Sequence, residues 1–377
     1  MNDYLSTNYK IYTDKYFLRA KSILQQEDIN PVVRYQIFVR KNIESLEGVN
    51  GAIQFIKSVV GDKVRIYALA EGKPYVVGQP IMKLEGRIQD LIDLETIYLG
   101  ILSGSLSGRI DLEKVRINAR AIVAEAGDKK VLYFGARHFF PWLDKGIAKI
   151  CCEEGFTGCS TDDGATAWDA EGVGTIPHAL VLAYGVNMRK KGIQRNPTVE
   201  ATKGFDRCMD KSIPRVALID TFNKESYDSI AVGCVLSNLS GVRIDTCGEN
   251  KAAVTRPHAA VNHFSGLSKY AFGNGVTISA VWGLRRDLDE ADLEHVKITV
   301  SSGFNSRKVS AFMEADRAYQ NIYGKPLFDS IGTGSLYNAV MATSDIVAYY
   351  SEIEEQWVSY SKTGRAEMFS SEMKEVE

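Results

Sequence analysis

The sequence has little net charge and no long apolar run. Lys and Arg number 45 against 47 Asp and Glu, which gives the 377 residues a formal net charge of −2. Because both signs are interspersed, there is no basic face for nucleic acid or an anionic membrane. The first residues are polar, and no apolar run approaches the roughly 18 residues that span a bilayer. We therefore expect a cytoplasmic protein without nucleic-acid or membrane partners.

Cysteine is also scarce and poorly placed for metal chemistry. The six cysteines form no Cys-x-x-Cys pair and have no histidine at ligand spacing, so we predict no metal-ligating residues. They are typical of small buried side chains in a reducing compartment. Cys159 and Cys247 lie in stretches that carry other signals, but neither has an adjacent base to make it a nucleophile. We assign no catalytic role to cysteine.

The apolar periodicity predicts an α/β protein whose first part is mainly antiparallel. Residues 32–40 and 64–69 alternate apolar and polar side chains, and 76–86 is strand-like with turn residues inside it. Helical periodicity occurs at 17–25, 93–103 and 112–126. The last of these helices is expected to connect two domains.

From Lys130 onward, short β-rich segments alternate with helical or Gly-rich ones. The six segments are 131–134, 155–161, 215–222, 242–246, 297–302 and 327–331. This alternation indicates a parallel sheet, either a βα barrel or a doubly wound sheet. Polar residues cluster at the strand ends, where a barrel carries its active site. They are Arg137, His138, Ser160, Thr161, Asp220, Thr221, Arg243, Asp245, Ser302, Gly303, Gly332 and Gly334. Each could be a turn residue, but together they are hard to explain as scaffold.

The motif Gly174-Thr175-Ile176-Pro177-His178-Ala179-Leu180 predicts a helix that begins near Pro177. Proline suits a first turn because it has no N–H to donate and a fixed φ. His178 is thereby placed at a helix N-terminus, where the dipole favours anions and disfavours a protonated imidazole. A neutral ring nitrogen can then attack a phosphoryl group. The motif leaves a capping or packing histidine open as the alternative.

Two glycine loops and one charged pair indicate a sugar phosphate. The loops 300–305 and 331–335 each precede an expected helical run, so their N–H groups can cradle phosphate. Arg243 and Asp245 alternate along a strand and project on the same side. The guanidinium can hold a phosphate while the carboxylate accepts sugar hydroxyls. A structural ion pair is equally compatible with this spacing.

Together these residues resemble the nicotinate phosphoribosyltransferases, and most of all the short archaeal-type branch of these type II phosphoribosyltransferases. Seven motifs stand in the family's order between Tyr12 and Ser335. They are Thr13-Asp14-Lys15-Tyr16, Phe134-Gly135-Ala136-Arg137-His138, Gly174-Thr175-Ile176-Pro177-His178-Ala179, Leu218-Ile219-Asp220-Thr221-Phe222, Val242-Arg243-Ile244-Asp245-Thr246, Val300-Ser301-Ser302-Gly303 and Ile331-Gly332-Thr333-Gly334.

The resemblance implies an α/β fold in which an irregular, TIM-like βα barrel follows an N-terminal β-rich α/β sandwich. It assigns 1–115 to the sandwich, 116–345 to the barrel with its phosphoribosyl site, and 346–377 to a C-terminal extension. It also implies a homodimer with shared active sites. The implied reaction belongs to NAD biosynthesis: nicotinate displaces pyrophosphate from C1 of phosphoribosyl pyrophosphate to give nicotinate mononucleotide, with ATP hydrolysis coupled through phosphohistidine.

The family's residue roles are carried over to matching positions. His178 matches the phosphorylated histidine, Arg137 an arginine that contacts pyridine and phosphates, and Tyr16 an aromatic that reaches into the partner's site to stack on the pyridine. The other expected substrate contacts are His138, Ser160, Thr161, Asp220, Arg243 and Asp245. The expected phosphate contacts are Ser302, Gly303, Gly332 and Gly334.

The chemistry requires anion clamps more than a strong base. Departure of pyrophosphate leaves positive charge on the ribose, and the pyridine nitrogen has no proton to remove. Mg²⁺ is expected with phosphoribosyl pyrophosphate and ATP, and Asp220 and Asp245 are expected to orient hydroxyls or Mg²⁺.

The sequence departs from the family in three places. Many relatives have Arg-Arg at Arg137-His138, which affects recognition of the nicotinate carboxylate. The segment 248–275, with His258 and His263, follows the ribose motif as an insertion, either an active-site lid or a surface excursion. The tail after Tyr350 lacks the cysteines of a metal knuckle found in some archaeal relatives, so we expect no structural zinc.

Three alternatives remain at this level. A quinolinate phosphoribosyltransferase shares the architecture but needs extra cationic residues for a second carboxylate. A nicotinamide-preferring enzyme needs a polar contact to the amide, which Ser160 could supply. A phosphoribosyl-pyrophosphate-binding sensor without turnover is the non-enzymatic alternative, and the joint presence of His178, Arg243 and Asp245 argues against it.

Overall fold

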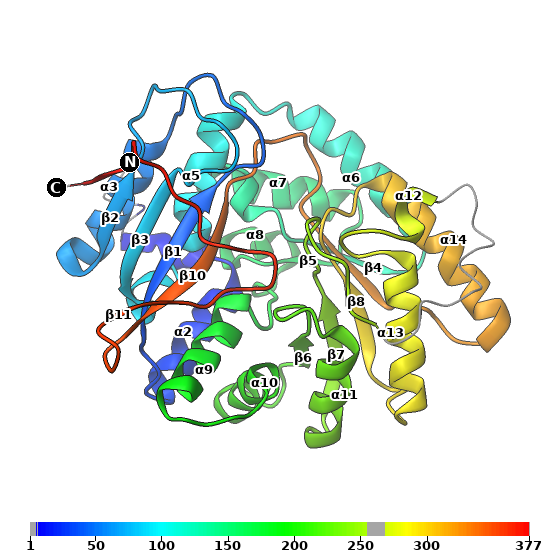
Figure 1. Ribbon diagram of the computed structural model, residues 1–377. Coiled ribbons are helices and arrows are strands. Elements are labelled where there is room, and N and C mark those ends of the chain that lie inside the picture. The colour runs from blue at the N-terminus through cyan, green and yellow to red at the C-terminus, as the bar shows by residue number, and fades with distance from the viewer. Residues whose placement is uncertain (1–4, 6, 255–267, 377) are drawn as a thin grey trace.

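Two six-stranded sheets organise the chain (Figure 1). The computed structural model describes residues 5, 7–254 and 268–376, and the protein is an α/β protein, as the sequence predicts. His258 and His263 of the expected insertion lie outside the described residues. No helix in the described part of the chain is both long and apolar enough to cross a bilayer.

The first sheet is antiparallel and combines both ends of the chain. Its strand order is β11-β10-β1-β3-β2-β12. The strands are β1 (Val32–Phe38), β2 (Arg65–Ala68), β3 (Met82–Arg87), β10 (Thr343–Ser351), β11 (Gln356–Ser359) and β12 (Lys374–Glu375). The residues assigned to a C-terminal extension therefore supply most of three strands to the sheet begun by the N-terminal part. The domain boundaries themselves stay a prediction.

The helices of this first part include both 3₁₀ turns and long amphipathic segments. They are η1 (Tyr9–Tyr12), α2 (Lys15–Gln26), α3 (Val49–Val60), η2 (Gly61–Lys63), α4 (Ile88–Leu91) and α5 (Glu95–Ser107). Strand β3 begins only at Met82, because Gly78 has a φ of 101° and Pro80 cannot donate to a ladder. Val76 and Val77, expected in a strand, are exposed instead.

The second sheet is parallel, with strand order β5-β4-β9-β8-β7-β6. Its strands are β4 (Lys130–Tyr133), β5 (Gly158–Cys159), β6 (Arg215–Leu218), β7 (Leu239–Ile244), β8 (Lys297–Val300) and β9 (Ser330–Thr333). Each lies within or overlaps one of the six predicted segments. The helices are α6 (Leu112–Ala126), η3 (Ala136–His138), α7 (Pro141–Glu153), α8 (Asp162–Ala165), η4 (Thr166–Trp168), α11 (Glu225–Val235), α12 (Ser268–Ala271), α13 (Ile278–Glu290) and α14 (Ser306–Tyr323).

The parallel sheet is a curled half-barrel and not a closed barrel within the described residues, since β5 and β6 are its two edges. Between them the chain forms α9 (His178–Lys190) and α10 (Pro197–Cys208). The apolar side chains of both helices, among them Leu180 and Phe205, pack in the core of the antiparallel part. These helices join the two parts of the molecule, so the expected barrel is only partly confirmed.

Candidate functional site

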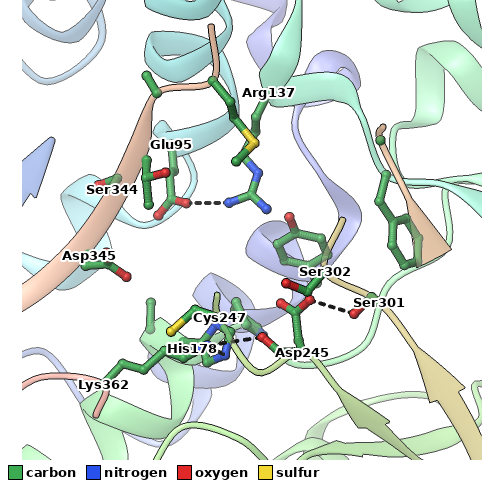
Figure 2. Close-up of a pocket in the computed structure, with 18 of the residues that line it drawn as sticks. Glu95, Arg137, His178, Asp245, Cys247, Ser301, Ser302, Ser344, Asp345 and Lys362 are labelled. Atoms are coloured by element: carbon green, nitrogen blue, oxygen red, sulfur yellow. Dashed lines mark hydrogen bonds and ion pairs between the residues drawn. The ribbon is translucent and has the colours of Figure 1, made fainter. Parts of the chain in front are cut away.

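A cavity of ≈ 270 Å³ lies between the carboxyl ends of the parallel strands and the antiparallel part. Residues after β4, β7, β8 and β9 line one side. Residues of α5, α9, β10 and the C-terminal segment line the other (Figure 2). Of the predicted site residues, those on its wall are Tyr16, Arg137, His138, His178, Arg243, Asp245, Ser302, Gly303, Gly332 and Gly334.

His178 stands at the first position of α9, with Pro177 as the N-cap. Its Nε2 lies 3.0 Å from Asp220 Oδ2 and 2.8 Å from Lys362 Nζ. Burial lowers the pKa of His178 and the Lys362 charge lowers it further, against the opposite effect of Asp220. The imidazole is therefore neutral near pH 7, as the helix N-terminus predicted.

Asp220 is an ionised partner of the His178 ring. Although burial would raise the pKa of Asp220, Lys362 and His178 together hold it well below its usual range. Asp220 is therefore a carboxylate and can only accept hydrogen bonds. Nε2 of His178 faces this acceptor and also the Lys362 ammonium, which can only donate, so the contacts fix no single tautomer. Asp220 contacts His178 but does not line the cavity. The substrate contact that the sequence predicted for Asp220 is therefore not seen.

Arg243 and Asp245 lie on the same side of the chain, as their spacing predicted. Arg243 Nη2 donates to Asp245 Oδ2 at 3.2 Å, and Ser301 Oγ donates to Asp245 Oδ1 at 2.6 Å. Arg243 Nε is buried without a hydrogen-bond partner in the described part of the chain. An unpaired guanidinium donor beside a cavity is suited to a phosphate oxygen, and the fixed carboxylate is suited to a sugar hydroxyl.

A buried carboxylate, Asp14, connects the aromatic and cationic residues at the other end. Asp14 Oδ2 accepts from Tyr16 Oη at 3.0 Å and from Thr96 Oγ1 at 2.9 Å, and it lies 3.6 Å from Arg137 Nε. Arg137 Nη1 also donates to Glu95 Oε1 at 2.9 Å. Arg137 is therefore held by two carboxyl groups beside the cavity.

Tyr16 lines the cavity of its own chain. The Arg243 guanidinium lies 6.0 Å from the Tyr16 ring centroid and 5.9 Å from that of Phe134. A single chain thus brings the two aromatic rings to one pocket. The expected entry of Tyr16 into a partner's site stays a prediction.

The two glycine loops differ. Ser302 and Gly303 have φ of 77° and 72° and precede α14, so this loop has the predicted form. The loop at Gly332 and Gly334 is followed by irregular chain up to β10, so the predicted helix there is wrong. A Cβ at Gly332 would meet the Phe134 ring, and one at Gly334 would meet the His138 ring. Glycine is needed here for close packing.

Three further predicted residues make structural contacts. Thr161 Oγ1 donates to Asp144 at 2.6 Å and Ser160 Oγ donates to Asp14; neither lines the cavity. His138 does line it, and its Nδ1 lies 2.9 Å from the Gly334 carbonyl oxygen. Burial lowers the pKa of His138 to about 4, so this ring is a neutral donor to the loop.

Sequence reasoning missed several residues of the antiparallel wall. They are Tyr35, Arg40, Glu95, Ser344, Asp345, Lys362 and Arg365. Among them, Arg365 Nε lies 2.8 Å from Asp345 Oδ2. Burial raises the pKa of another of them, Glu95, to about 8. Lys362 follows the last motif and has no neighbouring signal in the sequence. Only the pairing of β10 and β11 with the N-terminal strands brings this segment to the cavity.

The donor set does not fit a Mg²⁺ ion held by the protein alone. No group of three or more His, Cys, Asp or Glu side chains in the described residues is arranged for a metal. Asp220 is committed to His178 and Lys362 and does not line the cavity, and the charge of Asp245 is balanced by Arg243. The expected role of Asp220 in holding Mg²⁺ is therefore not supported, and we derive no step through a metal.

Comparisons with known proteins give a domain match over part of the chain and a fold match over most of it. Residues 14–106 match the N-terminal domain of quinolinate phosphoribosyl transferase. The nicotinate phosphoribosyltransferase structure from Porphyromonas gingivalis covers 94% of both chains with a TM-score of 0.65 at 14% identity. That from Vibrio cholerae covers 92% of this chain and 89% of its own, with a TM-score of 0.59 at 13% identity. Part of the chain is therefore similar to the N-terminal domain of quinolinate phosphoribosyl transferase, and the chain as a whole shares the fold of these nicotinate phosphoribosyltransferases.

The match to a curated relative covers part of this chain. Nicotinate phosphoribosyltransferase pncB1 of Mycobacterium tuberculosis is 22% identical over 179 residues. These are 47% of this chain and 37% of the relative, so the match spans less than half of the curated protein. The structural likenesses at 13% and 14% identity show the fold alone.

Proposed function

We propose that this protein is a nicotinate phosphoribosyltransferase, converting nicotinate and phosphoribosyl pyrophosphate to nicotinate mononucleotide and pyrophosphate with coupled ATP hydrolysis. The observation that carries the proposal is that one cavity holds His178 backed by Asp220, the Arg243–Asp245 pair, and Arg137 beside Tyr16. Nicotinate, phosphoribosyl pyrophosphate and ATP, with Mg²⁺ accompanying the phosphates, are the substrates we assign.

In the transfer step, the lone pair of the pyridine nitrogen attacks C1 of the ribose. The bond from C1 to the pyrophosphate oxygen breaks, and pyrophosphate leaves with the electron pair. No proton moves. Arg137 binds the nicotinate carboxylate, the Tyr16 and Phe134 rings hold the pyridine between them, and Asp245 orients the ribose while Arg243 binds its phosphate. Positioning and charge stabilisation supply the catalysis.

In the coupled step, Nδ1 of His178 attacks the γ-phosphorus of ATP, and ADP leaves with the electron pair of the broken P–O bond. The ring keeps its proton on Nε2, and the positive charge that develops on it is stabilised by Asp220. Free N–H groups at the start of α9 stabilise the phosphoryl oxygens.

The test is product analysis with each pyridine acid, with and without ATP. Wild-type protein should form nicotinate mononucleotide and hydrolyse ATP, and γ-labelled ATP should leave an acid-labile, base-stable label on the protein. His178→Ala should lose the label and the ATP stimulation but keep a slow ATP-independent transfer. If His178→Ala still hydrolyses ATP and still responds to it, His178 is only a structural residue.

Quinolinate is a second candidate substrate because the matched N-terminal domain carries that name. Its second carboxylate needs a further cation near the pyridine. Arg137 is held there between Glu95 and Asp14, an arrangement that suits one carboxylate. Turnover of quinolinate in preference to nicotinate in the same product analysis would favour this alternative.

A further inference from the structure

The segment from Tyr360 to Arg365 connects the two parts of the molecule beside the cavity. Tyr360 N–H donates to the Val347 carbonyl on β10 at 3.0 Å, and Thr363 N–H donates to the Thr221 carbonyl after β6 at 3.0 Å. The side chain between these two anchors is Lys362. Its backbone position is therefore fixed by both sheets.

The Lys362 ammonium is buried against the phosphoryl-accepting residues. Its side chain is 5% exposed. Besides its 2.8 Å approach to His178 Nε2, its Nζ donates to Asp220 Oδ2 and lies 3.4 Å from the Asp245 carbonyl oxygen. Figure 2 shows Lys362 and His178 converging on the same side of the pocket. The transfer and phosphoryl steps derived above assign Lys362 no part.

We propose that Lys362 is a positioning residue for the phosphoryl acceptor: its ammonium shares Asp220 with His178 and thereby keeps the imidazole neutral. This rests on the proposed function of His178 as phosphoryl acceptor. Lys362 itself contacts no reacting atom, because it lies against Nε2, the ring nitrogen that does not bond to phosphorus.

The charges around His178 give Lys362 this role. Three carboxyl groups act on the imidazole: Asp220 after β6, Asp245 after β7 and Asp345 on β10. Lys362 is the opposing cation in direct contact with the ring. Burial would lower the pKa of Lys362, but Asp220 and Asp245 outweigh it and hold that pKa above its usual value. The ammonium therefore stays charged at the pH at which His178 must be neutral.

Without this cation, the carboxyl groups should attract a proton to Nδ1. An opposite charge within about 4–6 Å favours the protonated form by about 1–3 pH units. The imidazolium has no lone pair, so the protein would accept phosphate from ATP only at higher pH. A residue that merely filled space would leave this pH dependence unchanged.

The experiment uses Lys362→Met and Lys362→Arg in the full chain. Histidine ¹⁵N shifts are recorded across pH, with His178→Ala used to assign the signal among the five histidines. Lys362→Met should raise the titration midpoint of His178 by about 1–3 pH units, whereas Lys362→Arg should stay near wild type. The acid limb of protein labelling from γ-labelled ATP should move by the same amount and in the same direction.

Lys129→Met is the matched control. Lys129 is also a buried lysine, 2.9 Å from the buried Asp316, and it does not line the cavity. This variant should leave the His178 midpoint unchanged.

An unchanged midpoint in folded Lys362→Met would overturn the proposal. If Lys362→Met does not fold, the wild-type shifts decide instead: a His178 titration midpoint at or above the usual value of about 6.5 would overturn it. If wild type takes no phosphate from ATP while the midpoint still shifts, the proposed function fails and the electrostatic role of Lys362 stands.

Discussion

Glu95 Oε1 accepts a hydrogen bond from Arg137 Nη1 at 2.9 Å, at the end of the cavity where the pyridine carboxylate is proposed to bind. Burial raises the pKa of Glu95 to about 8 despite the opposing effect of Arg137. Below that pH the carboxyl group is neutral and leaves the charge of Arg137 to a substrate. Above it, the ionised Glu95 competes for the same guanidinium.

We therefore expect the KM for nicotinate to rise about tenfold as the pH rises through about 8, the range expected for weakening one charge-assisted hydrogen bond. Glu95→Gln should abolish the rise, and initial-rate measurements across pH would show it. A KM that rises equally in Glu95→Gln would contradict the assignment.

The raised pKa of Glu95 also affects the stability of the fold. Because the folded-state pKa lies above 4.5, the stability that Glu95 contributes is complete below about pH 4.5 and is lost toward pH 8.

Asp245→Ala should weaken productive binding of phosphoribosyl pyrophosphate while the fold remains intact. Losing charge-assisted contacts to the ribose should cost about 1.5–3 kcal/mol of transition-state binding, measured as kcat/KM. Asp289→Ala is a useful comparison because Asp289 also pairs with an arginine, Arg285, yet it does not line the cavity. Unchanged turnover and KM in folded Asp245→Ala would remove this residue from the site.

The placement of Tyr16 in the cavity of its own chain makes a prediction about subunit mixing. Tyr16→Ala chains mixed with His178→Ala chains should regain no activity, because no chain then carries both residues. Tyr16→Phe is the control that keeps the ring and loses only the hydrogen bond to Asp14. Recovery of activity in mixed dimers would show a site shared between subunits, as the sequence resemblance implied.

Gly332 and Gly303 should respond differently to alanine. A Cβ at Gly332 would push on Phe134, so we expect about 1–3 kcal/mol of lost stability together with a raised KM for nicotinate. At Gly303 a Cβ meets nothing within 4 Å, and only its φ of 72° resists substitution, at a cost of about 1 kcal/mol. Thermal unfolding and steady-state kinetics would separate the two. Equal effects on KM would contradict a packing role for Gly332.

Much of the fold follows from local pattern. Each predicted β-rich segment after Lys130 contains or overlaps a strand, because buried parallel strands need short apolar runs whatever lies around them. The sequence did not predict that the barrel stays open. The apolar side chains of α9 and α10 do not indicate which sheet these helices will cover. Their packing on the antiparallel core leaves β5 and β6 as edges.

The same division holds at the site. The sequence by itself determined that His178 begins a helix and that Arg243 and Asp245 face the same way, since backbone geometry over a few residues decides both. Only the tertiary structure decided that Asp220 and Lys362 meet at His178 Nε2, and that Glu95 lies against Arg137. These contacts join segments far apart in the chain, which local sequence patterns do not reveal. Lysine and glutamate are also common on protein surfaces, so only burial between two sheets distinguishes Lys362 and Glu95 from the other lysines and glutamates of the chain.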